Sequence, residues 1–118
     1  MANEIEMSAR LSAAKGGAMI NPQTWTAIVN MTGRDMGQQT QDVGTSDEPL
    51  ALTADLGTPY KVLIYNMDLV NDIYVGPSSP YSFIVPHGEF ILLPRVEATL
   101  YVKAVTAPVK IFAQFCEI

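Results

Sequence analysis

Charged residues are scarce in this chain, and cysteine and histidine are nearly absent. Asp, Glu, Lys and Arg make up only 16% of the 118 residues, against about 25% in typical soluble domains. The single cysteine, Cys116, excludes an internal disulfide and a thiolate metal cluster. The single histidine, His87, has no companion ligands, so we expect no zinc site and no cofactor. No apolar run approaches the ~20 residues that span a bilayer, and we expect no membrane role.

Basic residues are few and dispersed. Twelve acidic and seven basic residues give a formal net charge of −5. Nucleic-acid binding requires several cations acting together on phosphates, and the basic residues of this chain never cluster. We therefore expect no direct contact with nucleic acid. The first residues hold neither a basic region nor an apolar run, so we also expect no secretory signal and synthesis in a cytoplasm.

The low charge also bears on the outer surface of the folded chain. Hydrophobic residues make up 48% of the sequence, which leaves few charged groups for solvent contact. One interpretation is that neighbours in an assembly cover part of this surface, which predicts a homo-oligomer. The alternative is a free monomer coated with Thr, Ser and Gln.

Period-2 alternation is the main secondary-structure signal. From Glu4 to Ser12 the apolar residues occupy odd positions and the polar residues even positions, which is typical of a half-buried strand. The alternation recurs over 100–104 and 109–115, and residues 61–65 form the compact apolar run of a central strand. Gly, Pro and Asn turns separate eight to ten such segments. The pattern predicts an all-β fold, an antiparallel β-sandwich of the jelly-roll or Greek-key type.

No linker or composition shift divides the chain, so we expect one domain over residues 1–118. Residues 33–48 are polar and predict a connection with one short strand around 37–43. The alternative is that residues 1–15 form an arm that pairs with a neighbouring subunit instead of its own sheet, because an exposed strand edge accepts an added strand.

Three groups of side chains are candidates for chemistry, and each has a simpler interpretation. His87 lies in a predicted turn, and Cys116 follows the end of the last predicted strand, so we expect no Cys-His pair and no enzyme. Residues 66–72 carry four oxygen side chains but lack the Gly and distal Glu of a calcium loop, which favours a side-chain-capped turn. The tyrosines and Trp25 suit a sugar-binding face, or a core or protein interface.

Short motifs follow one another in a particular order from residue 41 to residue 118. They are Gln41-Asp-Val-Gly-Thr45, Ala54-Asp-Leu-Gly-Thr58, Asn66-Met-Asp68, Asn71-Asp-Ile-Tyr-Val-Gly76, Pro86-His-Gly-Glu89 and Leu100-Tyr-Val-Lys-Ala104. That order resembles small virion structural proteins of tailed bacteriophages. The resemblance implies a jelly-roll or related β-sandwich unit, often a capsid cement or decoration protein. It supplies no catalytic residues.

This resemblance implies a capsid cement or decoration protein at the capsid surface of a virion. Its expected partners are the major capsid protein and copies of itself, bound through contact area that symmetry repeats. The partner contacts that we select from position and expected exposure are Ile5, Met7, Leu11, Trp25 and Tyr81. The alternatives are a tail, adaptor or baseplate component, and a carbohydrate-binding attachment module.

Overall fold

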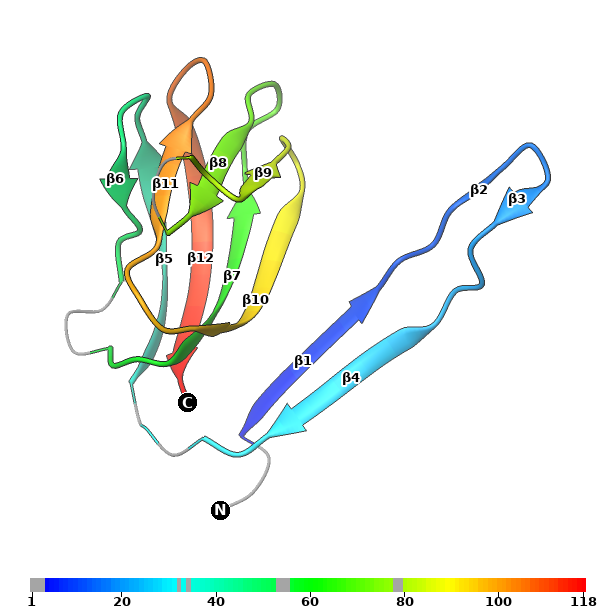
Figure 1. Ribbon diagram of the computed structural model, residues 1–118, viewed down its shortest axis with the longest axis horizontal. Helices are drawn as coiled ribbons and strands as arrows, with labels where there is room; N and C mark the ends of the chain where they lie inside the picture. The colour runs from blue at the N-terminus through cyan, green and yellow to red at the C-terminus, as the bar shows by residue number, and fades with distance from the viewer. Residues whose placement is uncertain (1–3, 32, 34, 53–55, 78–79) are drawn as a thin grey trace. The chain divides into compact units, whose positions relative to one another are not determined.

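The computed structural model describes residues 4–31, 33, 35–52, 56–77 and 80–118. All regular structure in these ranges is β-strand, and the chain divides into two units, Met1–Thr32 and Gly33–Ile118 (Figure 1). The strands are β1 (Ile5–Arg10), β2 (Ala14–Lys15), β3 (Ala18–Met19), β4 (Thr24–Val29), β5 (Met36–Val43), β6 (Glu48–Pro49), β7 (Tyr60–Asn66), β8 (Ile73–Gly76), β9 (Phe83–Val85), β10 (Phe90–Val96), β11 (Tyr101–Ala104) and β12 (Val109–Glu117).

The predicted all-β antiparallel fold is confirmed. Twelve strands occur among the described residues where we expected eight to ten, and three of the twelve (β2, β3 and β6) are only two residues long. Within these described ranges no helix is long and apolar enough to cross a membrane.

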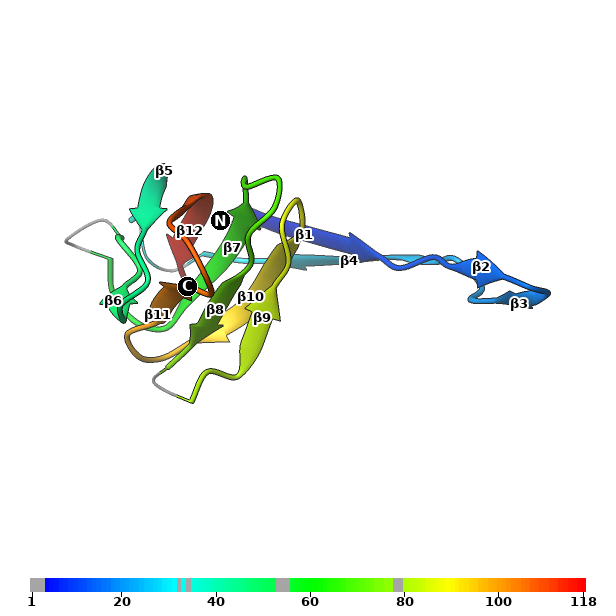
Figure 2. The same cartoon turned by 90° about the horizontal axis from the view of Figure 1, so that it is seen from above.

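The second unit is a sandwich of two four-stranded sheets. One sheet has the order β10-β7-β12-β5 and the other has the order β6-β11-β8-β9, with antiparallel neighbours throughout. Figure 2 shows the two sheets as facing layers. The apolar run 61–65 lies in β7, between β10 and β12, so its predicted central position is confirmed.

Alternate residues of the strands fill the space between the two sheets. In β7 and β12 they include Val62, Ile64 and Ile111, which are at most 1% exposed, and Ile73 of β8 faces them from the other sheet. Burying each such aliphatic side chain stabilises the fold by about 1.5–3 kcal/mol. One core cluster thus joins both sheets, which is the arrangement of a β-sandwich.

The polar segment 33–48 holds the predicted strand, which is longer than expected. β5 pairs with β12 along eight residues. The Gln41 side chain accepts a hydrogen bond from the Ala51 backbone N–H at 2.8 Å and donates to the Pro49 carbonyl at 3.2 Å. The Gln39 side chain also donates to the Ala51 carbonyl. These amides therefore hold the following loop against the strand.

The first unit is a hairpin of β1 and β4, with β2 and β3 at its tip. We expected one sandwich over residues 1–118, but among the described residues β1 shares a sheet with β4 alone. The chain returns along itself because Gly16 and Gly17 adopt positive φ angles of 58° and 87°, which favour glycine. Residues 1–3 of the expected arm lie outside the described residues, and its pairing with a neighbouring subunit stays a prediction.

Candidate functional site

The hairpin separates its side chains into an apolar face and a polar face. Paired residues of an antiparallel ladder lie on the same face. The first set, which we call the apolar hairpin face, consists of Ile5, Met7, Ala9, Trp25, Ala27 and Val29. The opposite face carries Glu6, Ser8, Arg10, Thr24, Thr26 and Ile28. The alternation that predicted a strand is therefore repeated on its partner strand, in matching register.

Exposure rises along the apolar hairpin face. Ile5 is buried and Met7 is half-buried, whereas Trp25 is 72% exposed. Leu11, the next apolar residue after β1, is 71% exposed. An isolated two-stranded hairpin is marginally stable in water, and large exposed apolar groups mark interaction sites. This face is the first candidate surface for a protein partner.

The hairpin tip continues the apolar character. Met19 is 74% exposed and Ile20 is 46% exposed, and the Ile20 N–H donates to the Ala13 carbonyl at 2.9 Å. A surface hollow is lined by Ala13, Ala14, Lys15, Ala18, Met19 and Ile20. Small side chains therefore leave room beside Met19 for a partner's side chain.

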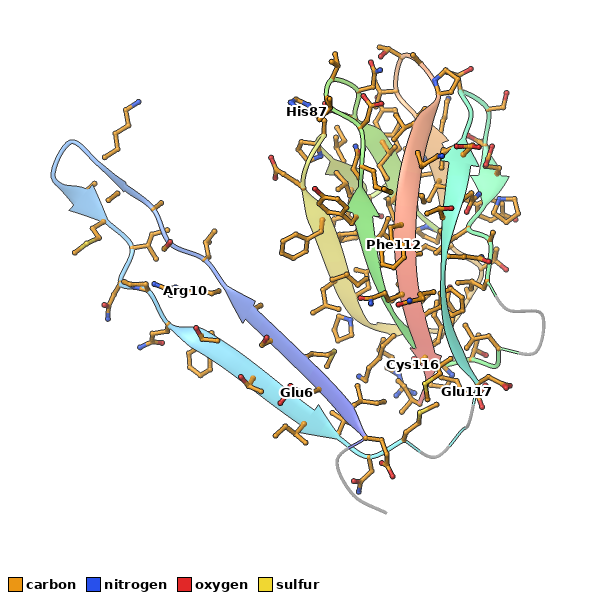
Figure 3. The ribbon with its side chains drawn as sticks, turned by 180° about the vertical axis from the view of Figure 1, so that it is seen from behind. Glu6, Arg10, His87, Phe112, Cys116 and Glu117 are labelled. Atoms are coloured by element: carbon orange, nitrogen blue, oxygen red, sulfur yellow. The ribbon has the colours of Figure 1, made fainter. Side chains whose placement is uncertain are left out.

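A second candidate surface lies on the outer face of the sheet β10-β7-β12-β5. Phe90 lies opposite Tyr65, and Tyr65 lies opposite Phe112 on the next strand. We call these three residues the outer aromatic row. Leu92 and Leu63 form the neighbouring row on the same face. Phe90 is 61% exposed, and Figure 3 shows Phe112 on β12 in the middle of this sheet.

The thiol of Cys116 lies near the end of β12 and is half-buried. Burial raises the pKa of this thiol, and the charge of Lys61 on the neighbouring strand partly offsets that increase. The thiol thus stays protonated at neutral pH. Figure 3 shows His87 and Cys116 at opposite ends of the sandwich, so the two do not form a nucleophile and base.

His87 lies in an exposed turn, as expected. Its ring Nδ1 is 3.2 Å from Asp72 Oδ1, and its backbone N–H donates to the same oxygen at 3.0 Å. Gly88 completes the turn with a φ of 71°. Among the described residues no group of three or more His, Cys, Asp or Glu side chains is placed to hold a metal ion.

The predicted side-chain-capped turn at 66–72 is confirmed by its hydrogen bonds. Asn66 is fully buried, and its amide donates to the carbonyls of Asn71 and Val85 at 3.0 and 3.1 Å. Its Oδ1 accepts from the Asp68 N–H at 2.9 Å. The Asp68 carboxylate accepts from the N–H groups of Asn71 and Val70, and these bonds lower its pKa. The side-chain oxygens of Asn66 and Asp68 therefore cap the turn itself.

Tyr81 is engaged inside the sandwich unit. Its ring stacks on Tyr74 with centroids 5.6 Å apart and an interplanar angle of 18°. Its hydroxyl donates to Asp47 Oδ1 at 2.7 Å. Burial, followed by the hydrogen bond and the negative charge of Asp47, raises the pKa of Tyr81 to about 12. The structure thus gives this residue an intramolecular role, and its contact with a partner stays a prediction.

The five residues selected from the sequence fall into two groups. Ile5, Met7 and Trp25 lie on the apolar hairpin face, and Leu11 follows β1 directly. Tyr81 belongs to the other unit. The outer aromatic row was missed, although the successive apolar residues of 62–65 already put apolar side chains on both faces of that strand. Comparison with protein-family models, curated proteins and solved structures finds no match for the chain.

Proposed function

We propose that this protein is a structural subunit of a tailed-bacteriophage virion, a capsid cement or decoration protein that binds across major capsid protein subunits. The carrying observation is the apolar hairpin face, on which Trp25 is 72% exposed in a two-stranded ribbon. A protein surface that covers this face would complete a small hydrophobic core. The short-motif resemblance supplies the phage context.

The strand order supports the jelly-roll type that the resemblance implies. Successive strands from β5 to β12 alternate between the two sheets, except that β8 and β9 share one. Eight strands in two such sheets, connected across the sandwich, are the pattern of a jelly roll. Virion subunits often use this architecture.

Both units of the chain offer a candidate binding surface. The hairpin offers its apolar face, and the sandwich offers the outer aromatic row. A subunit that binds only the assembled shell stabilises that shell by its binding free energy. Joining two contacts in one chain raises the effective concentration of the second, and capsid symmetry repeats each contact many times. Stabilisation then needs contact area and no reaction step.

The surroundings of the aromatic rings favour a protein partner over a sugar. Trp25 shares its face with aliphatic side chains such as Met7, while the polar side chains lie on the opposite face. A sugar site requires polar groups beside the aromatic ring to fix the orientation of the hydroxyls. Tyr74 and Tyr81 stack on each other, and the Tyr81 hydroxyl already binds Asp47.

The test uses particles of the encoding phage from which the gene has been deleted. Adding the purified protein is expected to raise the temperature at which the particles release DNA. Trp25→Ala should abolish this effect, whereas Thr26→Ala, on the opposite face of the same strand, should retain it. A protein absent from purified virions would contradict the proposal.

Copy number separates the capsid from the tail. On the order of hundreds of copies per virion fits a decorated shell, since icosahedral symmetry repeats each site. A ring of about six or twelve copies would instead place the protein on the tail axis, and would overturn the cement assignment.

A further inference from the structure

We propose that two copies of the chain associate by pairing β1 antiparallel with β1 of the second copy, about a two-fold axis at Ser8. The inference rests on the part of the proposed function in which the protein binds copies of itself. It adds the strand, the register and the residues that specify them.

The outer edge of β1 is available for pairing. The hairpin is a two-stranded sheet of β1 and β4, and no other described strand pairs with β1. An edge strand presents unpaired N–H and C=O groups to a further strand. Two hairpins joined along β1 would form a four-stranded sheet, and a sheet of three or more strands with a hydrophobic face is stable where a lone hairpin is marginal.

The charges of β1 are self-complementary about Ser8. Glu6 and Arg10 lie on the polar face, each two positions from Ser8 (Figure 3). In a two-fold antiparallel pair centred on Ser8, each residue faces the one equally far from Ser8 on the other side. Glu6 therefore faces Arg10 of the second copy, and Arg10 faces its Glu6. Oppositely charged residues directly across a ladder stabilise the pairing.

Neither charge is used within the described part of its own chain. The ion pairs found there are His87 with Asp72 and Arg95 with Glu97. Glu6 and Arg10 are both exposed on the same strand, too far apart along it to pair with each other. In the dimer, Glu6 and Arg10 of one copy thus form two ion pairs with Arg10 and Glu6 of the other.

The same register matches the apolar side chains. Met7 faces Ala9 of the second copy, and Ile5 faces its Leu11, because odd positions pair with odd positions. Both apolar hairpin faces consequently lie on one side of the four-stranded sheet. The dimer doubles the surface that the proposed function assigns to shell binding.

Two competing pairings are less well supported. An axis at Met7 would set Glu4 against Arg10, but Glu4 precedes β1 and its Oε1 accepts the Met31 backbone N–H at 3.1 Å in its own hairpin. Pairing along the free edge of β4 would bring together Thr24–Val29, which carries no charge to specify a register.

Charge variants of the full-length protein test the inference by sedimentation velocity over a concentration series. Glu6→Arg and Arg10→Glu should each weaken self-association by roughly tenfold, because each variant sets like charges opposite one another. An equimolar mixture of these two variants should restore the dimer, since one copy then carries two cations and the other two anions. Lys15→Glu, the same charge change at the hairpin tip, should leave the dimer unchanged.

Disulfide trapping tests the register independently of affinity. In a Cys116→Ser background, Ser8→Cys should form an intermolecular disulfide, because directly opposed residues of a ladder lie within disulfide range. Thr26→Cys is the matched control, since Thr26 pairs with Ser8 on the same face but lies in β4. Cross-linking through Thr26→Cys would place the contact at β4, and cross-linking through Met7→Cys would shift the axis. Either result overturns the inference.

Failure of the dimer and failure of the proposed function give different results. A wild-type protein that is monomeric at all concentrations, yet still stabilises particles, would overturn the dimer alone. A Ser8-linked dimer that never binds particles would support the β1 pairing and contradict the cement assignment.

Discussion

Trp25 lies directly opposite Ala9 across the β1–β4 ladder, and its side chain is 72% exposed. The methyl group of Ala9 is too small to cover an indole ring. The neighbouring pair on the same face, Met7 and Ala27, adds a single long side chain. The largest apolar group of the hairpin therefore remains accessible to a partner.

Fluorescence of Trp25 reports the covering of this face. It is the only tryptophan of the chain, so the emission spectrum of the free protein should be that of a solvent-exposed indole. Adding phage particles that lack this protein should shift the Trp25 emission to shorter wavelength, because the partner replaces water around the indole ring. An unchanged spectrum during demonstrated binding would show that the apolar hairpin face stays in solvent.

The outer aromatic row should matter for binding more than for stability. Phe90→Ser removes a side chain that is 61% exposed, so the free energy of unfolding should change by no more than about 1 kcal/mol. If the row docks on the shell, particle affinity should fall by more than about tenfold, as for an aromatic anchor. Gln114→Ala, on the same outer face, is the control. Equal particle affinities of the wild type and the two variants would show that the outer aromatic row does not bind the shell.

Among the polar residues of the sandwich, Asn66 should contribute most to the free energy of unfolding. Asn66→Ala deletes the partner of two backbone carbonyls and of the Asp68 N–H. Leaving buried polar groups unsatisfied costs about 1–3 kcal/mol, and the cavity adds to that loss. Urea unfolding should show a lower midpoint with an unchanged slope. A midpoint equal to that of wild type would mean that the turn does not depend on this amide.

The Tyr81 hydroxyl should lose its proton at a higher pH than an ordinary tyrosine. Its pKa is raised to about 12, by burial first and then by the hydrogen bond and charge of Asp47. Because the folded-state pKa lies above the unfolded value of about 10, the contribution of Tyr81 to stability is complete below pH 10 and is lost as pH rises towards 12. Ultraviolet titration should find two delayed tyrosines, Tyr81 and Tyr60, because burial also raises the pKa of Tyr60. Asp47→Asn should lower the pKa of Tyr81 and leave that of Tyr60 unchanged. A tyrosine set that titrates uniformly near 10 would refute this.

Much of the fold follows from alternation alone. The strands predicted at 100–104 and 109–115 correspond to β11 (Tyr101–Ala104) and β12 (Val109–Glu117), and residues 61–65 lie in β7, between two other strands of their sheet. Alternation fixes which residues share a face but not which strand pairs with which. For that reason the sequence did not reveal that β1 pairs with β4 in a unit separate from the sandwich.

The candidate site was predictable where its residues are close in sequence. Ile5 and Met7 alternate on one strand, and Trp25 reaches their face through a single return of the chain. Phe90, Tyr65 and Phe112 share one row only because β7 lies between β10 and β12 in the sheet. Tyr81 was selected for its place in a loop, but its hydroxyl binds Asp47, which is 34 residues away. Such long-range contacts leave no local pattern.

An electron cryomicroscopy map of the encoding phage would show whether the apolar hairpin face contacts the shell. We expect many symmetry-related copies on the capsid, each with its apolar hairpin face covered by another subunit and Trp25 out of solvent. A map in which the protein is present but this face points into solvent in every copy would contradict it.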